Sequence, residues 1–100
     1  MIGESEDARV IVKIYGVLRD TLGWSEKIFR IEKGISLKEF LEREVPEIID
    51  YIEGESQQNF ESDRGIILLV GGVITPLKDI NKIMISRDLE IEILPSIVGG

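Results

Sequence analysis

Asp88-Leu-Glu-Ile-Glu-Ile-Leu94 decides the fold, because it alternates charged and aliphatic residues shortly before the sequence closes. Such alternation is typical of a β-strand that has one buried and one open face. A short tail, Pro95-Ser-Ile-Val98, follows the strand and leads to Gly99-Gly100. Glycine has no Cβ to obstruct a narrow channel, so an enzyme can draw in such a tail and reach its last carbonyl. We therefore expect the terminal carboxylate of Gly100 to be the reactive group.

Other stretches predict three more strands and one capped helix. The strands are expected in segments that are rich in β-branched and aliphatic residues: Val10–Tyr15, Glu26–Glu32 and Ile66–Val70. Ser36-Leu-Lys-Glu39 has the spacing of a capping box, and the apolar residues behind it recur at helical intervals. Pro46 should end that helix near Glu44 or Val45. The predicted order is strand, strand, helix, strand, irregular segment, strand.

The connections between these elements are less regular. Val17–Leu22 predicts a short helical turn closed by Gly23, and Glu47–Ile52 predicts a second turn after the main helix. Gly54–Gly65 is polar and is expected to be a surface loop. Thr75–Ser86 fits no single element.

Length and composition predict a single domain. A chain of 100 residues can bury about two-thirds of its unfolded surface. Residues 1–7 predict a flexible acidic tail, residues 8–94 the folded domain and residues 95–100 the Gly-Gly tail. The N-terminal segment has neither a basic nor an apolar signal region, so a cytoplasmic location is expected.

Charge and residue types argue against several classes of site. A net charge of −7 disfavours a nucleic-acid surface, which needs clustered Lys and Arg. The sequence has no Cys and no His, so it lacks a thiolate nucleophile, the commonest general base and the usual ligands of transition metals. Gly71-Gly72 stands without the residues of a phosphate-binding loop. We therefore expect no bound metal or cofactor, and we expect a partner to supply the catalytic groups.

Two parts of the sequence resemble MoaD-type sulfur carriers of the ubiquitin-like MoaD/ThiS superfamily. Val12-Lys-Ile-Tyr-Gly-Val-Leu-Arg-Asp-Thr-Leu-Gly23 resembles the opening strand and turn of that family. Thr75-Pro-Leu-Lys-Asp79 and Leu94-Pro-Ser-Ile-Val-Gly-Gly100 resemble its last stretch, in which a second proline is usual where Ser96 stands here. The resemblance implies an α+β fold of the ubiquitin-like β-grasp type, with a mixed sheet of four to five strands covered on one face by a helix.

The family resemblance also implies a reaction. In such carriers, a ubiquitin-activating-type enzyme uses ATP to adenylate the terminal glycine, and sulfur then replaces one carboxylate oxygen to give a thiocarboxylate. By resemblance, Gly100, preceded by Gly99, would donate this sulfur to the large subunit of molybdopterin synthase for molybdenum cofactor biosynthesis. The chain would be the small, sulfur-donating subunit. The ATP would be used by the activating partner, not bound by the chain itself.

The ubiquitin-like order further predicts a partner surface. Three residues of the apolar strand should point inward: Ile66, Leu68 and Val70. This leaves Ile67 and Leu69 on the open face as candidate partner contacts. Leu94 should be the last residue held by the strand ladder, since Pro95 has no N–H. Four residues at the end of the strand and in the tail are also expected to contact the partner: Leu94, Pro95, Ile97 and Val98.

Three alternatives remain open within this fold. The chain can be a ubiquitin-like modifier, in which Gly100 forms an isopeptide bond with lysines of other proteins. It can be a carrier for the thiolation of tRNA or of thiamine. It can also be a plain β-grasp interaction domain in which the Gly-Gly end has no function.

Overall fold

The computed structural model describes residues 7–56 and 66–95, with side chains for residues 7–51 and 66–95. This part of the chain contains five strands, three α-helices and one short 3-10 helix. In chain order they are β1 (Asp7–Ile14), α1 (Gly16–Leu22), β2 (Glu26–Glu32), α2 (Leu37–Glu44), α3 (Pro46–Ser56), β3 (Ile66–Val70), β4 (Val73–Ile74), η1 (Leu77–Asp79) and β5 (Leu89–Pro95).

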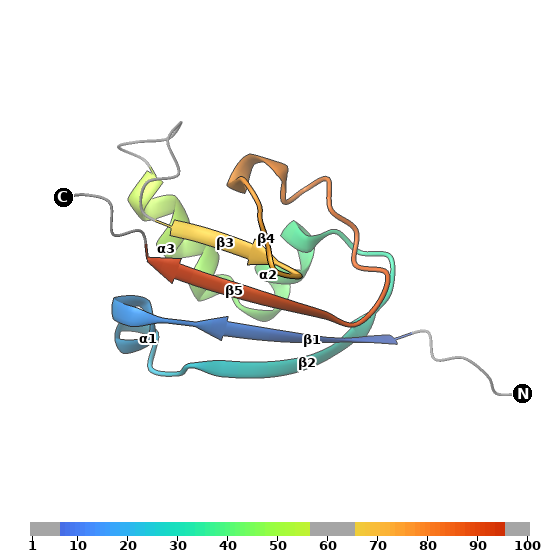
Figure 1. Ribbon diagram of the computed structural model, residues 1–100, viewed down its shortest axis with the longest axis horizontal. Helices are drawn as coiled ribbons and strands as arrows, with labels where there is room; N and C mark the ends of the chain where they lie inside the picture. Colours follow the sequence, from blue (N-terminus) through green and yellow to red (C-terminus); the bar gives the residue numbers. More distant parts are fainter. Residues whose placement is uncertain (1–6, 57–65, 96–100) are drawn as a thin grey trace, which may run out of the picture.

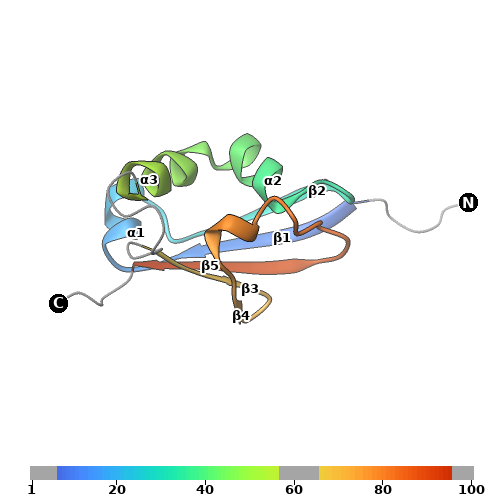
Figure 2. The same cartoon turned by 90° about the horizontal axis from the view of Figure 1, so that it is seen from above.

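The strands form one mixed sheet in the order β2-β1-β5-β3-β4 (Figure 1). β1 and β5 run parallel, and the other neighbouring strands run antiparallel. α2 and α3 lie on one face of the sheet, and no described helix covers the opposite face (Figure 2). This arrangement is the ubiquitin-like β-grasp that the sequence predicted.

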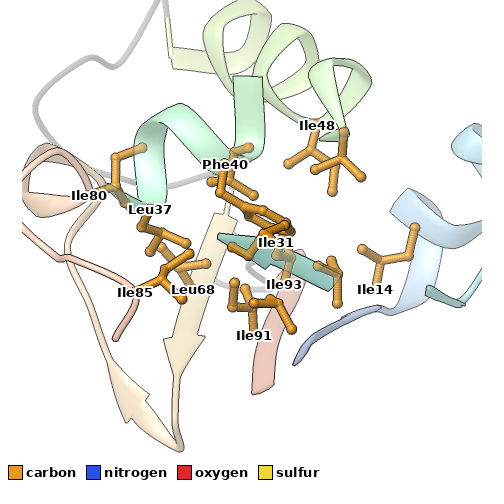
Figure 3. Close-up of a cluster of buried hydrophobic side chains, with 14 of the residues drawn as sticks. Ile14, Ile31, Leu37, Phe40, Ile48, Leu68, Ile80, Ile85, Ile91 and Ile93 are labelled. Carbon is orange, nitrogen blue, oxygen red and sulfur yellow. The ribbon is translucent and has the colours of Figure 1, made fainter. Parts of the chain in front are cut away.

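The hydrophobic core lies between the sheet and the two helices, and aliphatic side chains fill it (Figure 3). Every second residue of β1 from Ala8 to Ile14 is buried, because alternate side chains of a strand point to opposite faces. Phe40 of α2 is fully buried, and its ring meets the ring of Phe29 edge-on at a centroid distance of 5.3 Å. The helices are therefore fixed to the inner face of the sheet, and the outer face remains available.

The start of the main helix confirms half of its predicted capping box. The side chain of Ser36 accepts a hydrogen bond from the backbone N–H of Glu39 at 3.0 Å, whereas the carboxylate of Glu39 lies 3.6 Å from the guanidinium of Arg43. Pro46 begins α3, at a position where a missing N–H costs nothing. α3 continues to Ser56, so the prediction of a loop from Gly54 was wrong for residues 54–56. A polar composition does not distinguish a solvated last turn of helix from a loop. Residues 57–65 lie outside the described part.

Thr75–Ser86, whose sequence fits no single element, packs against the start of α2. Ile80 is buried, and its carbonyl accepts a hydrogen bond from the N–H of Lys38 at 3.1 Å. The carbonyl of Ile83 accepts from the N–H of Leu37 at 2.7 Å. Both donors belong to the first turn of the helix, where no intrahelical acceptor is available. This segment therefore completes α2 as well as the core.

The strand pairing reaches one residue into each segment predicted to be a tail. Asp7 lies opposite Glu32 at the start of β1. Pro95 lies opposite Ile66 at the end of β5, one residue beyond the predicted limit at Leu94. Proline is tolerated there because the last position of a strand needs no further ladder hydrogen bond.

Candidate functional site

β5 leads the chain out of the sheet beside the end of β1. It is paired on both sides, with β1 and with β3. The N–H of Tyr15 donates to the carbonyl of Ile93 at 3.2 Å, which holds the end of β1 against β5. α1 begins at this point and lies beside the end of β5 (Figure 1). We call this rim of the sheet the exit rim, because residues 96–100 continue from it.

Gly16 and Pro95 pack against each other at the exit rim. Gly16 has φ +64°, in the left-handed region that favours glycine. A Cβ added to Gly16 would lie 2.8 Å from the Cγ of Pro95, closer than real Cβ contacts. These two residues come from the two segments that carry the family resemblance, and here they are neighbours. Because residue 16 is a glycine, the backbone can turn into α1 and the ring of Pro95 can pack against it.

Four aliphatic residues form a patch on the open face, which we call the open-face cluster: Ile67, Leu69, Ile74 and Leu94. Ile67 lies opposite Leu94, and Leu69 lies opposite Ile74, so the side chains of each pair share a face. Ile67, Leu69 and Leu94 are half-buried by their neighbours, whereas Ile74 is 72% exposed. The cluster is therefore a partly covered apolar patch on the open face, and Ile74 is its most exposed member.

A polar stripe separates this cluster from β2. The Nζ of Lys13 lies 2.9 Å from the carboxylate of Glu90, and the hydroxyl of Tyr15 donates to the carboxylate of Glu92 at 2.9 Å. The hydrogen bond to Glu90, and then the charge of Glu90, raise the pKa of Lys13. The hydrogen bond to Glu92, aided by desolvation, raises the pKa of Tyr15. These two contacts join β1 to β5 across the open face.

The structure brings together the predicted partner contacts that it describes. Ile67, Leu69 and Leu94 lie in the open-face cluster, and Pro95 follows at the exit rim. The remaining predicted site residues lie outside the described residues: Ile97, Val98, Gly99 and Gly100. Their placement is not described.

Two features of the site are absent from the predictions drawn from the sequence. Ile74 extends the open-face cluster onto β4. The β-branched pair Val73-Ile74 directly after Gly71-Gly72 is the signal of a returning hairpin strand, and it could have identified this residue. The role of Gly16 depends on the position of Pro95, which is 79 residues away in the sequence. No local pattern reports such a contact.

The described residues meet neither the requirements of a metal site of three or more ligands nor those of a membrane-spanning helix. Within residues 7–51 and 66–95, no group of three or more acidic residues is placed to hold a metal ion. Among the described helices, none is both long enough and apolar enough to span a bilayer.

No protein-family model matches the sequence, and no curated protein sequence does. Solved structures do match the fold. The small archaeal modifier protein 1 from Methanosarcina acetivorans aligns with a TM-score of 0.60 and 25% identity, over 96% of this chain and 100% of that chain. A protein of Haloferax volcanii, HVO 2177, aligns with a TM-score of 0.54 and 11% identity, over 100% of this chain and 93% of that one.

A third structure is that of a candidate molybdopterin converting factor, subunit 1, from Pyrococcus furiosus. It aligns with a TM-score of 0.53 and 14% identity, over 90% of this chain and 99% of that chain. The low identities of the second and third structures show a shared fold alone. The sheet order, the helices on one face and these neighbours agree with the resemblance found in the sequence. The chain has a ubiquitin-like fold of the MoaD/ThiS type.

Proposed function

We propose that the chain is a ubiquitin-like sulfur carrier that acts through the carboxylate of Gly100. The observation that carries this proposal is the exit rim, where β5 is paired with β1 up to Ile93 and with β3 up to Pro95, and where Pro95 packs against Gly16. Five residues follow Pro95, up to and including Gly100, and when extended they can reach about 17 Å from the rim. A rigid strand followed by a short glycine-ended segment suits delivery of a carboxylate into another protein's active site.

The proposed reaction needs only the terminal carboxylate of this chain. In the first step, a carboxylate oxygen of Gly100 attacks the α-phosphorus of ATP in the activating enzyme, and pyrophosphate leaves. In the second step, hydrosulfide attacks the acyl carbon and loses its proton, and AMP leaves with one of the original carboxylate oxygens. The product is a thiocarboxylate. Its sulfur then attacks the acceptor, and water hydrolyses the acyl–sulfur bond, which leaves the sulfur on the acceptor and restores the carboxylate. The absence of Cys and His from the chain does not hinder either step.

The finer assignment is to molybdenum cofactor biosynthesis. In this proposal the chain is the small subunit of molybdopterin synthase, and the large subunit receives Gly99 and Gly100. The segments that resemble the MoaD type support this assignment, since they include the strand–turn opening and the end of β5 that meet at the exit rim. The chain would work in the cytoplasm and bind no cofactor itself.

We assign the open-face cluster to partner docking. The cluster borders the end of β5, so a protein bound to it would stand beside Pro95, the last described residue. Half-buried aliphatic side chains provide apolar contact area, and the polar stripe beside them provides directional contacts. An activating enzyme and an acceptor would use the same surface in turn.

A second candidate function is protein modification. The neighbour with 25% identity is named a small archaeal modifier protein, and it covers almost the whole chain. In that case a lysine amine, not sulfur, would attack the activated carbonyl of Gly100 and release the leaving group. Carriers for tRNA or thiamine thiolation would share the activation step and differ only in the acceptor.

The activation step can be tested by ATP–pyrophosphate exchange with each adenylating enzyme of the ubiquitin-activating type from the same organism. Deletion of Gly100 should abolish exchange, because the shortened end stops about 3.5 Å before the reactive groups. Leu69→Asp should raise the chain concentration needed for half-maximal exchange by tenfold or more, an estimate of about 1.4 kcal/mol of lost binding.

The matched control is Met84→Asp, since Met84 is 54% exposed and lies outside the open-face cluster. This variant should support exchange as the unaltered chain does. If no adenylating enzyme uses the intact chain, the carrier and the modifier are both excluded and the plain interaction domain remains. If deletion of Gly100 has no effect on exchange, the reactive group has been assigned to the wrong residue.

A further inference from the structure

β2 forms one outer edge of the sheet. It pairs with β1 on one side, and no described strand pairs with its other side. Figure 1 shows β2 at the lower rim of the sheet, with no described element beyond it and with α2 and α3 placed over the strands above it. An unprotected edge of this kind is a template for pairing with another strand.

The direction of the backbone groups of β2 follows from its pairing with β1. Ile14 donates its N–H to the carbonyl of Ser25 at 2.9 Å, so this pair is hydrogen-bonded. In an antiparallel ladder such pairs alternate with pairs that are not hydrogen-bonded. In the pairing of β1 with β2, Glu26, Ile28 and Arg30 therefore belong to the pairs that are not hydrogen-bonded. Their N–H and C=O groups therefore point away from β1, toward the unpaired edge.

On the open face, the charged residues on either side of Ile28 are equally far from it and have opposite signs. Glu26, Ile28 and Arg30 share the open face of the sheet, and all three are exposed, Ile28 at 58%. An acidic residue lies two positions before Ile28 and a basic residue lies two positions after it. Two antiparallel copies of this strand place opposite charges together.

We propose that β2 pairs with β2 of a second copy of this chain, antiparallel and centred on Ile28. In this register Ile28 meets Ile28 of the second copy as a hydrogen-bonded pair, and each Glu26 meets the Arg30 of the other copy. The sheet becomes continuous across the dimer. Since Ile11 lies opposite Ile28 in β1, four isoleucines form one row on the open face.

Charge selects this register over its neighbours. A ladder centred on Phe29 would place Glu26 opposite Glu32 of the second copy, and one centred on Arg30 would place two arginines together. Like charges directly opposite each other destabilise a strand pair. A ladder centred on Lys27 would place two lysines together and would leave Ile28 opposite Glu26. Among the registers centred on residues 27–30, which pair most of the strand, only the one centred on Ile28 opposes unlike charges on both sides.

The test is sedimentation equilibrium of the full chain at concentrations up to about a millimolar, because a single strand ladder is a small interface and forms a weak dimer. Glu26→Arg and Arg30→Glu should each raise the dimer dissociation constant by about tenfold or more, since each places like charges together twice. A mixture of the two single variants should form a heterodimer, because its two chains oppose arginine to glutamate at both positions. The double variant E26R/R30E should also recover the dimer.

Matched controls separate this ladder from general charge effects. Asp50→Arg and Lys82→Glu change the net charge by the same amounts at exposed positions away from β2, and they should leave the dimer unchanged. A chain that stays monomeric throughout the concentration range overturns the proposal. Dimers that survive both single variants, or a mixture that stays monomeric when each single variant is monomeric, also overturn it. The measurement involves neither ATP nor Gly100, so it is independent of the carrier function.

Discussion

Leu68 and Leu69 are adjacent leucines on the same strand, yet they belong to opposite faces of the sheet. Leu68 is 1% exposed and lies in the core beneath the helices. Leu69 is half-buried on the open face, opposite Ile74 and beside Glu92. The inner face therefore determines stability, and the open face is available for recognition. Adjacent side chains of a strand point to opposite faces. A shift of one residue therefore moves an aliphatic side chain from the core to the open face.

The largest expected contrast is between alanine substitutions of these two leucines. Leu68→Ala should lower the free energy of unfolding by about 2–5 kcal/mol, because it leaves a cavity in a packed core. Leu69→Ala should cost roughly 1 kcal/mol or less, since its side chain is already partly in water. Urea unfolding followed by circular dichroism gives both values. Equal losses of unfolding free energy in the two variants would show that Leu69 contributes as much to stability as Leu68.

A second contrast compares two glycines with positive φ at the ends of α1. Gly16→Ala should lower the free energy of unfolding by about 2–4 kcal/mol, because backbone strain adds to the contact of the new Cβ with Pro95. Gly23→Ala should cost about 1 kcal/mol, since its φ is +87° but no atom lies within 4 Å of the added Cβ. Thermal or urea unfolding measures both.

The contact with Pro95 can be isolated by a double-mutant cycle. Pro95→Ala removes the ring that the new Cβ would meet, so it should recover part of the loss caused by Gly16→Ala. If the double variant loses as much unfolding free energy as the two single variants together, backbone strain at Gly16 accounts for the whole effect of Gly16→Ala. The exit rim would then not depend on this contact.

The smallest expected effect concerns the polar stripe at alkaline pH. The pKa of Tyr15 is raised from 10.0 in the folded state by its bond to Glu92, and that of Lys13 is raised from 10.5 by Glu90. A raised pKa means that the stabilisation is fully present below the unfolded value and is lost as the pH rises through the folded value. The chain should therefore lose stability above about pH 10.

Tyr15→Phe removes one of these two contributions without changing the shape of the side chain. The variant should show a smaller decrease in its free energy of unfolding between about pH 9 and pH 11.5 than the unaltered chain. Identical pH profiles would mean that the bond between Tyr15 and Glu92 is too solvated to stabilise the open face.

Local patterns in the sequence were sufficient for most of the fold. The alternation in residues 88–94 predicted β5, and the spacing from Ser36 to Glu39 predicted the start of α2. These two features depend on neighbouring residues, so a sequence pattern can report them. The two-residue period placed Leu68 and Leu69 on opposite faces, and the resemblance to the ubiquitin-like order assigned Leu68 to the inner face.

Features that depend on distant contacts were not predictable in this way. The segment from Thr75 to Ser86 has no regular pattern, because its structure is determined by hydrogen bonds to residues 34–38. The contact between Gly16 and Pro95 joins opposite ends of the chain. In the candidate site, the cluster residues on β3 followed from strand parity together with the resemblance to the ubiquitin-like order, but Ile74 required the pairing of β4 with Leu69.

The central claim, that Gly100 carries the chemistry, is tested most directly by the mass of the C-terminal peptide. The chain would be incubated with its adenylating enzyme, ATP and a sulfide source, and then digested and analysed by mass spectrometry. The account predicts a mass change equal to the exchange of one oxygen for one sulfur, confined to the peptide that ends at Gly100 and absent when Gly100 is deleted. An unchanged C-terminal peptide, under conditions in which the enzyme converts another carrier, would contradict it.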